Sequence, residues 1–232
     1  MTAIPEQADS LSPRQRRKAL RRLRNEPPVR SLLEEIGNSV SHGAGALLSV
    51  AGMIILLVKA QTVSARIAAA IYGSCLILLF LMSCLYHAFP RGSGVKRLWR
   101  RFDYSSIYLL IGGTFTPLWL VYIGGTTGLV LCCAQWLVIA AGITFIAVFG
   151  PGSLRPMHQT LYMVLGWTGL VFLPRLWRGN PGFFWTLLAG GVIYTLGVIP
   201  FARKTKGAHF LWHLFVLGGA AVQWAGICRC LY

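Results

Sequence analysis

The carboxylate side chains of this sequence are confined almost entirely to its first 35 positions. Of six Asp and Glu residues in a chain of 232, five lie at or before Glu35, and Asp103 is the only one between residues 36 and 232. The surface of a water-soluble domain needs interspersed charges of both signs, which that long stretch lacks. Charged residues make up 12% of the chain, against ~25% in a typical soluble domain. We therefore expect an integral membrane protein.

Seven segments are long and apolar enough to cross a bilayer, which needs about 20 such residues per helix. They are bounded by charged residues, glycine or proline, and cover residues 40–58, 67–89, 102–122, 128–149, 157–173, 183–202 and 208–228. The fifth is the shortest, and Pro156 and Pro174 mark its two ends. The predicted fold is an all-α bundle of seven transmembrane helices in residues 34–232, preceded by a basic tail in residues 1–33.

The distribution of Lys and Arg predicts the orientation, because short cytoplasmic loops carry an excess of these residues. Seventeen of them lie in the N-terminal segment and in the gaps after the second, fourth and sixth spans, and five lie on the opposite side. We expect a cytoplasmic N-terminus and an external C-terminus. The formal net charge of +16 is thus a consequence of topology, and nucleic acid is not an expected partner.

The basic tail carries signals for a short helix. Ser12 and Pro13 are typical of a helix start, and a proline pair after Arg24 is typical of a stop. Such a helix would lie on anionic lipid headgroups, where each Lys or Arg contributes ~1 kcal/mol. The alternative is a disordered tail that only enforces orientation. Residues 1–35 contain no apolar core of signal-peptide length, so we expect the tail to be retained.

Ionisable side chains inside the predicted spans are candidates for function, because each costs ~2.5–3.5 kcal/mol at the centre of a membrane helix. Every one of them lies at the predicted cytoplasmic end of its span. The set is His42, His87, Asp103, His158, His209 and His213. Their common depth predicts a single site just inside the cytoplasmic leaflet.

The spacing of His209 and His213 suits a metal ion. Residues four apart lie on one face of a helix, so two imidazoles can fill two corners of a tetrahedron. His87, at the inner end of the second span, is the proposed third ligand, which leaves a fourth position for water. Asp103 would bind through that water or act as its base.

Each of these residues also has a simpler interpretation. The two histidines of the seventh span can be interfacial, and Asp103 can pair with Arg100 or Arg101 among the headgroups, a contact worth ~0–1 kcal/mol. We expect His42 and His158 to be interfacial, or to contact the ligands, rather than to bind a metal themselves.

Four motifs resemble those of the hemolysin III family, the bacterial branch of the progestin and adipoQ receptor (PAQR) superfamily. They are Glu34-Glu35-Ile-Gly-Asn38-Ser-Val-Ser-His42, Ser83-Cys-Leu-Tyr-His87-Ala-Phe, Asp103-Tyr104 and His209-Phe-Leu-Trp-His213-Leu-Phe. The resemblance runs from about residue 34 to 217. It implies seven helices with a cytoplasmic N-terminus in the bacterial inner membrane.

The resemblance also implies a zinc ion. Carried over by motif, its ligands are His87, His209 and His213, with Ser83 and Asp103 near the metal-bound water. Tyr86, beside His87, is expected to contact the ligands or lie at the interface. Many relatives carry a further histidine late in the last span, where this chain has Gln223. The three ligands are present in this chain, but the role of that further histidine in its relatives does not carry over to Gln223.

The wider superfamily includes intramembrane enzymes that cut lipid amides such as ceramide, and the bacterial branch was named for haemolysis. We interpret the chain as a zinc-dependent intramembrane hydrolase of a lipid amide or ester, with Asp103 acting on water and Ser83 as a hydrogen-bond donor. One alternative is a receptor or signalling protein with structural zinc. Another is a haemolysin-type pore or transporter, although no ladder of polar residues crosses the spans. No sequence feature specifies an oligomeric state.

Overall fold

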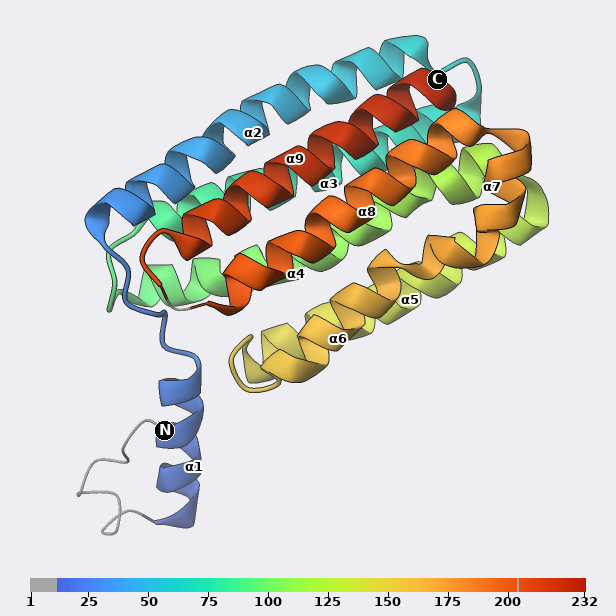
Figure 1. Ribbon diagram of the computed structural model, residues 1–232. Coiled ribbons are helices and arrows are strands. Elements are labelled where there is room, and N and C mark those ends of the chain that lie inside the picture. The colour runs from blue at the N-terminus through green and yellow to red at the C-terminus, as the bar shows by residue number, and fades with distance from the viewer. Residues whose placement is uncertain (1–11, 204) are drawn as a thin grey trace.

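The computed structural model describes residues 12–203 and 205–232, and throughout this part of the chain the regular structure is helical (Figure 1). Six of the helices there have the length and composition to cross a membrane. They are α2 (Leu32–Lys59), α3 (Val63–Ala88), α4 (Gly94–Pro117) with its π-helical continuation η2 (Leu118–Ile123), α5 (Gly125–Phe149), α8 (Pro181–Ala202) and α9 (Ala208–Cys230). The expectation of an all-α membrane protein is confirmed.

The outer surface of the bundle is apolar. Large side chains such as Leu47 and Leu137 are 75% and 72% exposed, a cost that a water-soluble protein would avoid and a bilayer removes. The inner surface is also apolar, with Tyr72, Leu118 and Leu56 fully buried. A bundle that is hydrophobic on both sides needs lipid around it.

The helices pack mainly with their neighbours in sequence. The most extensive contacts join α2 with α3, α3 with α4, and α8 with α9, and α2 also packs on α9. Figure 1 shows these helices side by side with their axes nearly aligned. One end of the bundle therefore gathers the first turns of α2, α4 and α9 with the last turns of α3 and α8.

The segment predicted as the fifth span, residues 157–173, is not one continuous helix. It consists of α6 (Arg155–Gly166) and the 3-10 helix η3 (Thr168–Phe172), and α7 (Leu173–Gly179) follows. The Thr168 hydroxyl donates to the Leu165 carbonyl at 2.7 Å, which competes with regular helical bonding. A glycine stands on either side of this break, at positions 166 and 169, where helix propensity is low.

Two tight features join α4 to α5. Gly124 and Gly125 have φ values of +65° and +58°, a conformation that glycine adopts without steric cost. Gly128 lies in the first turn of α5, and a Cβ atom at this position would stand 2.0 Å from the backbone oxygen of Trp119 in η2. The close packing of η2 on α5 therefore depends on the absence of a side chain at this position.

The expected basic helix is present as α1 (Pro13–Arg24). Ser12 and Gln15 cap it reciprocally, each side chain bonding to the other residue's backbone N–H. None of its residues is buried, and it projects beyond the end of the bundle, at a steep angle to the membrane helices (Figure 1). Asn25 fastens it to the α5–α6 loop, accepting from the Gly152 N–H at 2.9 Å and donating to the Phe149 carbonyl at 3.1 Å.

Candidate metal centre

Two imidazoles meet on the first turns of α9. The helix starts after Gly207, and the i, i+4 spacing brings the Nε2 atoms of His209 and His213 to 3.3 Å from each other. Two nitrogens that bind one tetrahedral zinc at ~2.0–2.1 Å lie about 3.3–3.4 Å apart. The pair therefore already has the separation of two ligands on one ion.

A third imidazole comes from the last turn of α3. His87 offers a ring nitrogen that lies, with those of His209 and His213, in a group whose members are all within 4.8 Å of one another. His87 and His213 are buried, at 3% and 2% exposed. The three predicted ligands, from positions far apart in the sequence, thus converge on one point that can hold a metal ion.

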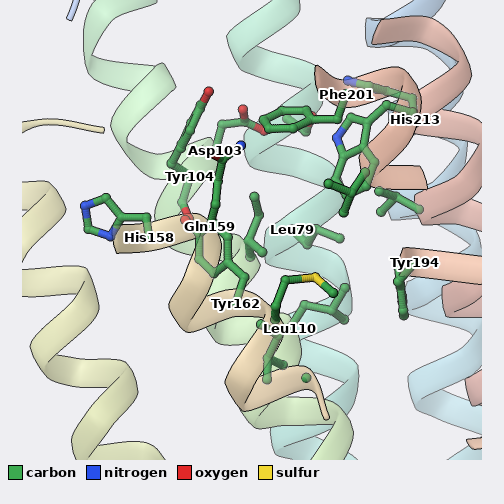
Figure 2. Close-up of a pocket in the computed structure, with 18 of the residues that line it drawn as sticks. Leu79, Asp103, Tyr104, Leu110, His158, Gln159, Tyr162, Tyr194, Phe201 and His213 are labelled. Atoms are coloured by element: carbon green, nitrogen blue, oxygen red, sulfur yellow. The ribbon is translucent and has the colours of Figure 1, made fainter. Parts of the chain in front are cut away.

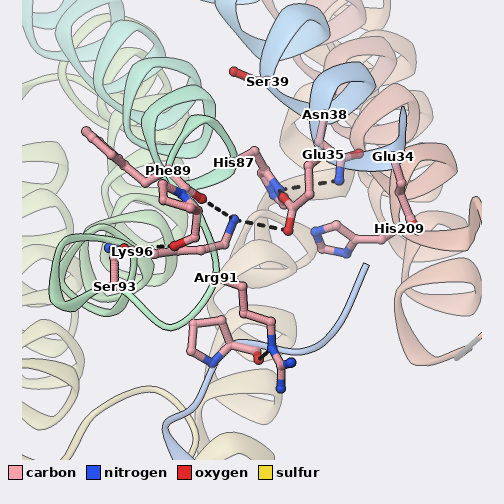
Figure 3. Close-up of polar contacts among 12 residues, drawn as sticks. Glu34, Glu35, Asn38, Ser39, His87, Phe89, Arg91, Ser93, Lys96 and His209 are labelled. Carbon is pink, nitrogen blue, oxygen red and sulfur yellow. Dashed lines mark hydrogen bonds and ion pairs between the residues drawn. The ribbon is translucent and has the colours of Figure 1, made fainter. Parts of the chain in front are cut away.

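The ring of His87 is oriented by a carboxylate from α2. Its Nδ1 lies 2.5 Å from Oε2 of Glu35 and 3.4 Å from the amide nitrogen of Asn38 (Figure 3). A carboxylate at this distance fixes a proton on Nδ1, which leaves the lone pair on Nε2. That Nε2 atom is buried and has no hydrogen-bond partner among the described residues. A buried nitrogen with no hydrogen-bond partner, close to two other imidazoles, is what a metal ligand requires.

Glu35 is itself held by a buried lysine. Its other oxygen, Oε1, lies 3.0 Å from Nζ of Lys96, and this ammonium also donates to the Phe89 carbonyl at 2.9 Å (Figure 3). The Lys96 side chain is 1% exposed and that of Glu35 15% exposed. Since an unpaired buried charge is costly, the lysine and the carboxylate stabilise each other and keep His87 in place.

Asp103 and Ser83 lie beside the imidazoles without joining them as ligands. Asp103 comes from α4, and Ser83 is a buried residue of α3. Both line one cavity together with His209 and His213. Asp103 is not part of the compact group of ligand atoms. The arrangement is three nitrogen ligands with a carboxylate nearby, as in zinc sites that keep an open position.

The cavity has a volume of about 170 Å³ and a mostly apolar wall. Figure 2 shows Asp103, Phe201 and His213 at one end of it and Leu110 at the other, with Leu79 between. Gln223 lines the cavity as well, about 15 Å along α9 from His213 at 1.5 Å per residue. The cavity thus extends from the polar cluster into the apolar interior of the bundle.

The remaining candidates have different surroundings. The ring of His42 stacks on that of His213 with centroids 3.8 Å apart, and Tyr86 lies against His87 at 4.5 Å. Both contact ligands without belonging to the metal-binding group. His158 lines the cavity, but its Nδ1 is 2.9 Å from the Tyr108 hydroxyl. This bond ties α6 to α4.

Glu35 and Lys96 were not predicted as parts of the site. In the sequence Glu35 belongs to the acidic cluster before the first span, and Lys96 to the basic gap after the second. The available signal was the position of Glu35 one turn before Asn38 and two before His42, which places all three on one face of a helix. For Lys96 the sequence offers no comparable signal.

These observations define the class of protein: a helical membrane protein with a buried triad of histidines that can hold a metal ion beside an internal cavity. The model of the "Haemolysin-III related" family matches residues 30–224. The chain therefore belongs to the hemolysin III family and, with it, to the PAQR superfamily.

Individual relatives agree. Hemolysin-3 of Bacillus cereus is 39% identical over 195 residues, covering 82% of this chain and 88% of the relative. The hemolysin-3 homolog of Bacillus subtilis (strain 168) is 32% identical over 198 residues, covering 83% and 92%. The human monocyte to macrophage differentiation factor is similar at 26% identity over 207 residues, covering 86% and 85%.

Proposed function

We propose that the protein is a zinc-dependent intramembrane hydrolase that cleaves an amide or ester bond of a lipid. One observation carries the proposal: three imidazoles converge within 4.8 Å, while the nearby carboxylate of Asp103 lies outside their group. Structural zinc sites are closed by four protein ligands, whereas catalytic sites have three and an open position. The count of ligands here favours catalysis.

A zinc ion, when bound, would be held by His87, His209 and His213 and would supply Lewis-acid chemistry and a water nucleophile at neutral pH. The residues of the chain do the rest. Asp103 accepts the proton that water loses and returns it to the leaving oxygen or nitrogen, as a general acid–base does. Ser83, which lines the cavity beside Asp103, donates its single hydroxyl proton to the substrate carbonyl. Water adds across the acyl bond, giving a carboxylic acid and an alcohol or amine.

The position of the site favours a lipid substrate. The polar cluster opens into a cavity with an apolar wall, inside a bundle whose outer surface is also apolar. Helices α6 and α8 both line that cavity, yet their backbones scarcely approach each other. An acyl chain can enter between them from the bilayer and reach the imidazoles with its carbonyl.

We infer the topology from charge. The basic residues of α1, the α3–α4 gap and the α8–α9 loop share one end of the bundle with the histidines, which the positive-inside rule assigns to the cytoplasm. The α6–η3–α7 segment then serves as the fifth of seven spans, with the C-terminus outside. The setting is the inner membrane of a bacterium. Cysteine labelling from either side, at Lys206 and at Arg178, tests this arrangement.

We propose that residues 1–33 form a basic tail ahead of the membrane domain of residues 34–232, with its last residues reaching the site, where Arg30 lines the cavity. Seven of the twelve residues of α1 are Arg or Lys, and all of them are exposed. Because α1 projects beyond the end of the bundle at a steep angle to its helices (Figure 1), its basic side chains can meet anionic headgroups. Vesicle binding with and without anionic lipid tests this role.

The hydrolase is tested by comparing wild type with Asp103→Asn. The wild type is expected to release fatty acid from a panel of lipid amides and esters. The variant should keep its zinc and lose at least about 100-fold in rate, the effect of a general acid–base. Zinc in both proteins with no turnover in either would refute the hydrolase and favour structural zinc. Ion conductance without hydrolysis would favour a pore.

A further inference from the structure

Two arginine side chains line the cavity at the end that holds the imidazoles. Arg30 comes from the segment just before α2, and Arg155 is the first residue of α6. Both line the cavity together with His209. The entrance to the site is therefore flanked by two positive charges from different parts of the chain.

Neither arginine forms an ion pair with a carboxylate within the described part of the chain. In residues 12–203 and 205–232 the ion pairs join Glu35 with His87 and Lys96, and Glu26 with Arg97. The Nη1 atom of Arg30 is buried without any hydrogen-bond partner there. A buried donor left unsatisfied is costly, so Arg30 is arranged to meet an acceptor that the described residues do not supply.

Arg155 is held at the same entrance by an aromatic ring. Its guanidinium lies over the ring of Phe201 at 5.2 Å from the centroid, and Phe201 also lines the cavity (Figure 2). A cation–π contact orients the group without neutralising its charge. The hydrogen-bond donors of Arg155 are left available to a ligand.

The charges of the cavity wall favour an anion. Among the described residues that line it, Asp103 is the one carboxylate, set against Arg30 and Arg155. A divalent ion at the imidazoles would add to the positive excess. Arginine binds phosphate with paired hydrogen bonds in a geometry that its planar fork matches. A neutral lipid amide would offer neither arginine a negative charge.

We propose that the ligand of this site is a phospholipid whose phosphate binds between Arg30 and Arg155. The inference rests on the proposed function and names its substrate class. In a glycerophospholipid only the glycerol backbone separates the phosphate from the acyl ester, so a phosphate at the entrance brings the ester carbonyl toward the imidazoles. The acyl chain then fills the apolar part of the cavity, beside Leu79 and Leu110. Hydrolysis adds water across the ester, giving a fatty acid and a lysophospholipid.

The test is a binding titration with lipids that cannot be cleaved. Purified full-length protein in detergent is titrated with diether phosphatidylglycerol and, for comparison, with the matching diether glycerol that lacks phosphate, and the bound lipid is counted by native mass spectrometry. Arg30→Gln and Arg155→Gln are each expected to weaken binding of the phospholipid about tenfold, or 1.4 kcal/mol. Neither should change binding of the uncharged lipid.

Arg203→Gln is the matched control, because Arg203 is exposed just after α8 at the same end of the bundle and does not line the cavity. It should bind phospholipid like the wild type. Equal affinity for the lipid with and without phosphate would overturn the proposal, as would unchanged binding in both arginine variants. If glycerol phosphate binds as tightly as the whole lipid, the arginines bind a soluble anion. If the two substitutions weaken binding of a fatty acid more than binding of the phospholipid, the arginines bind a carboxylate.

This experiment separates the inference from the hydrolase. Binding that requires Arg30 and Arg155, in a protein that hydrolyses no ester phospholipid, would refute the enzyme and support the ligand. Hydrolysis of an ester phospholipid at the same rate in wild type and both variants would support the enzyme and refute the ligand.

Discussion

Replacing Glu35 by glutamine tests whether the carboxylate that bonds His87 sets the metal affinity. The substitution keeps the size of the side chain and removes the charge that faces Nδ1 of His87 and Nζ of Lys96. The Nδ1 proton is then less firmly fixed, and the ring is a weaker and less well oriented ligand. Loss of such a partner typically lowers metal affinity 10–100-fold, which corresponds to about 1.4–2.7 kcal/mol.

The same substitution should lower stability, because Lys96 is 1% exposed and would lose its charged partner, keeping the Phe89 carbonyl and the ring of Tyr86. Breaking a buried pair by removing one member costs about 3–5 kcal/mol, and the 15% exposure of Glu35 places the expected loss near the lower limit. Zinc affinity is measured by competition with a metal-binding dye, and stability by thermal unfolding in detergent.

Two further variants separate orientation of the ligand from burial of the lysine. Glu34→Gln is the matched control, since Glu34 is the adjacent carboxylate and has no ion pair among the described residues. It should leave zinc affinity unchanged. Combining Glu35→Gln with Lys96→Met should recover stability without recovering zinc affinity. If Glu35→Gln binds zinc as tightly as Glu34→Gln, the carboxylate does not set the strength of the His87 ligand.

Two other predictions concern residues outside the ligand set. His158→Ala should retain the full zinc content, because its Nδ1 bonds the Tyr108 hydroxyl; loss of zinc on metal analysis would show that this histidine belongs to the centre. Gly128→Ala should destabilise the protein by about 1–3 kcal/mol, because its Cβ would stand 2.0 Å from the Trp119 backbone oxygen. Gly166→Ala, with nothing within 4 Å of the added Cβ, should be tolerated; equal melting temperatures for these two glycine variants would contradict the packing argument.

The membrane helices were predictable because their hydrophobicity is a property of each segment alone. Hydropathy located six of them, but it missed the first turns of α2, which starts at Leu32 instead of residue 40. Ser31 caps that helix by accepting from the Glu34 N–H, and its first polar turns fall outside an apolar window. The break after Gly166 was missed for the opposite reason, because Thr168 and two glycines change backbone bonding without lowering hydropathy much.

The parts of the candidate site that follow from residue spacing along a helix and from depth in the membrane were predictable. The i, i+4 pair on α9 is visible in sequence, and the depth of His87 suggested it as the third ligand. The bond from Glu35 to His87 joins the first turn of α2 to the last turn of α3, a pairing that depends on how the two helices pack. The stacking of His42 on His213 depends on packing in the same way.

The most direct test of the central claim is the zinc content of purified wild type beside His209→Ala and His213→Ala, each checked for intact folding by its thermal unfolding. We expect about one zinc per wild-type chain and little in either variant, because two imidazoles alone leave a zinc site incomplete. Folded variants that keep the zinc content of the wild type would contradict a metal centre formed by His87, His209 and His213.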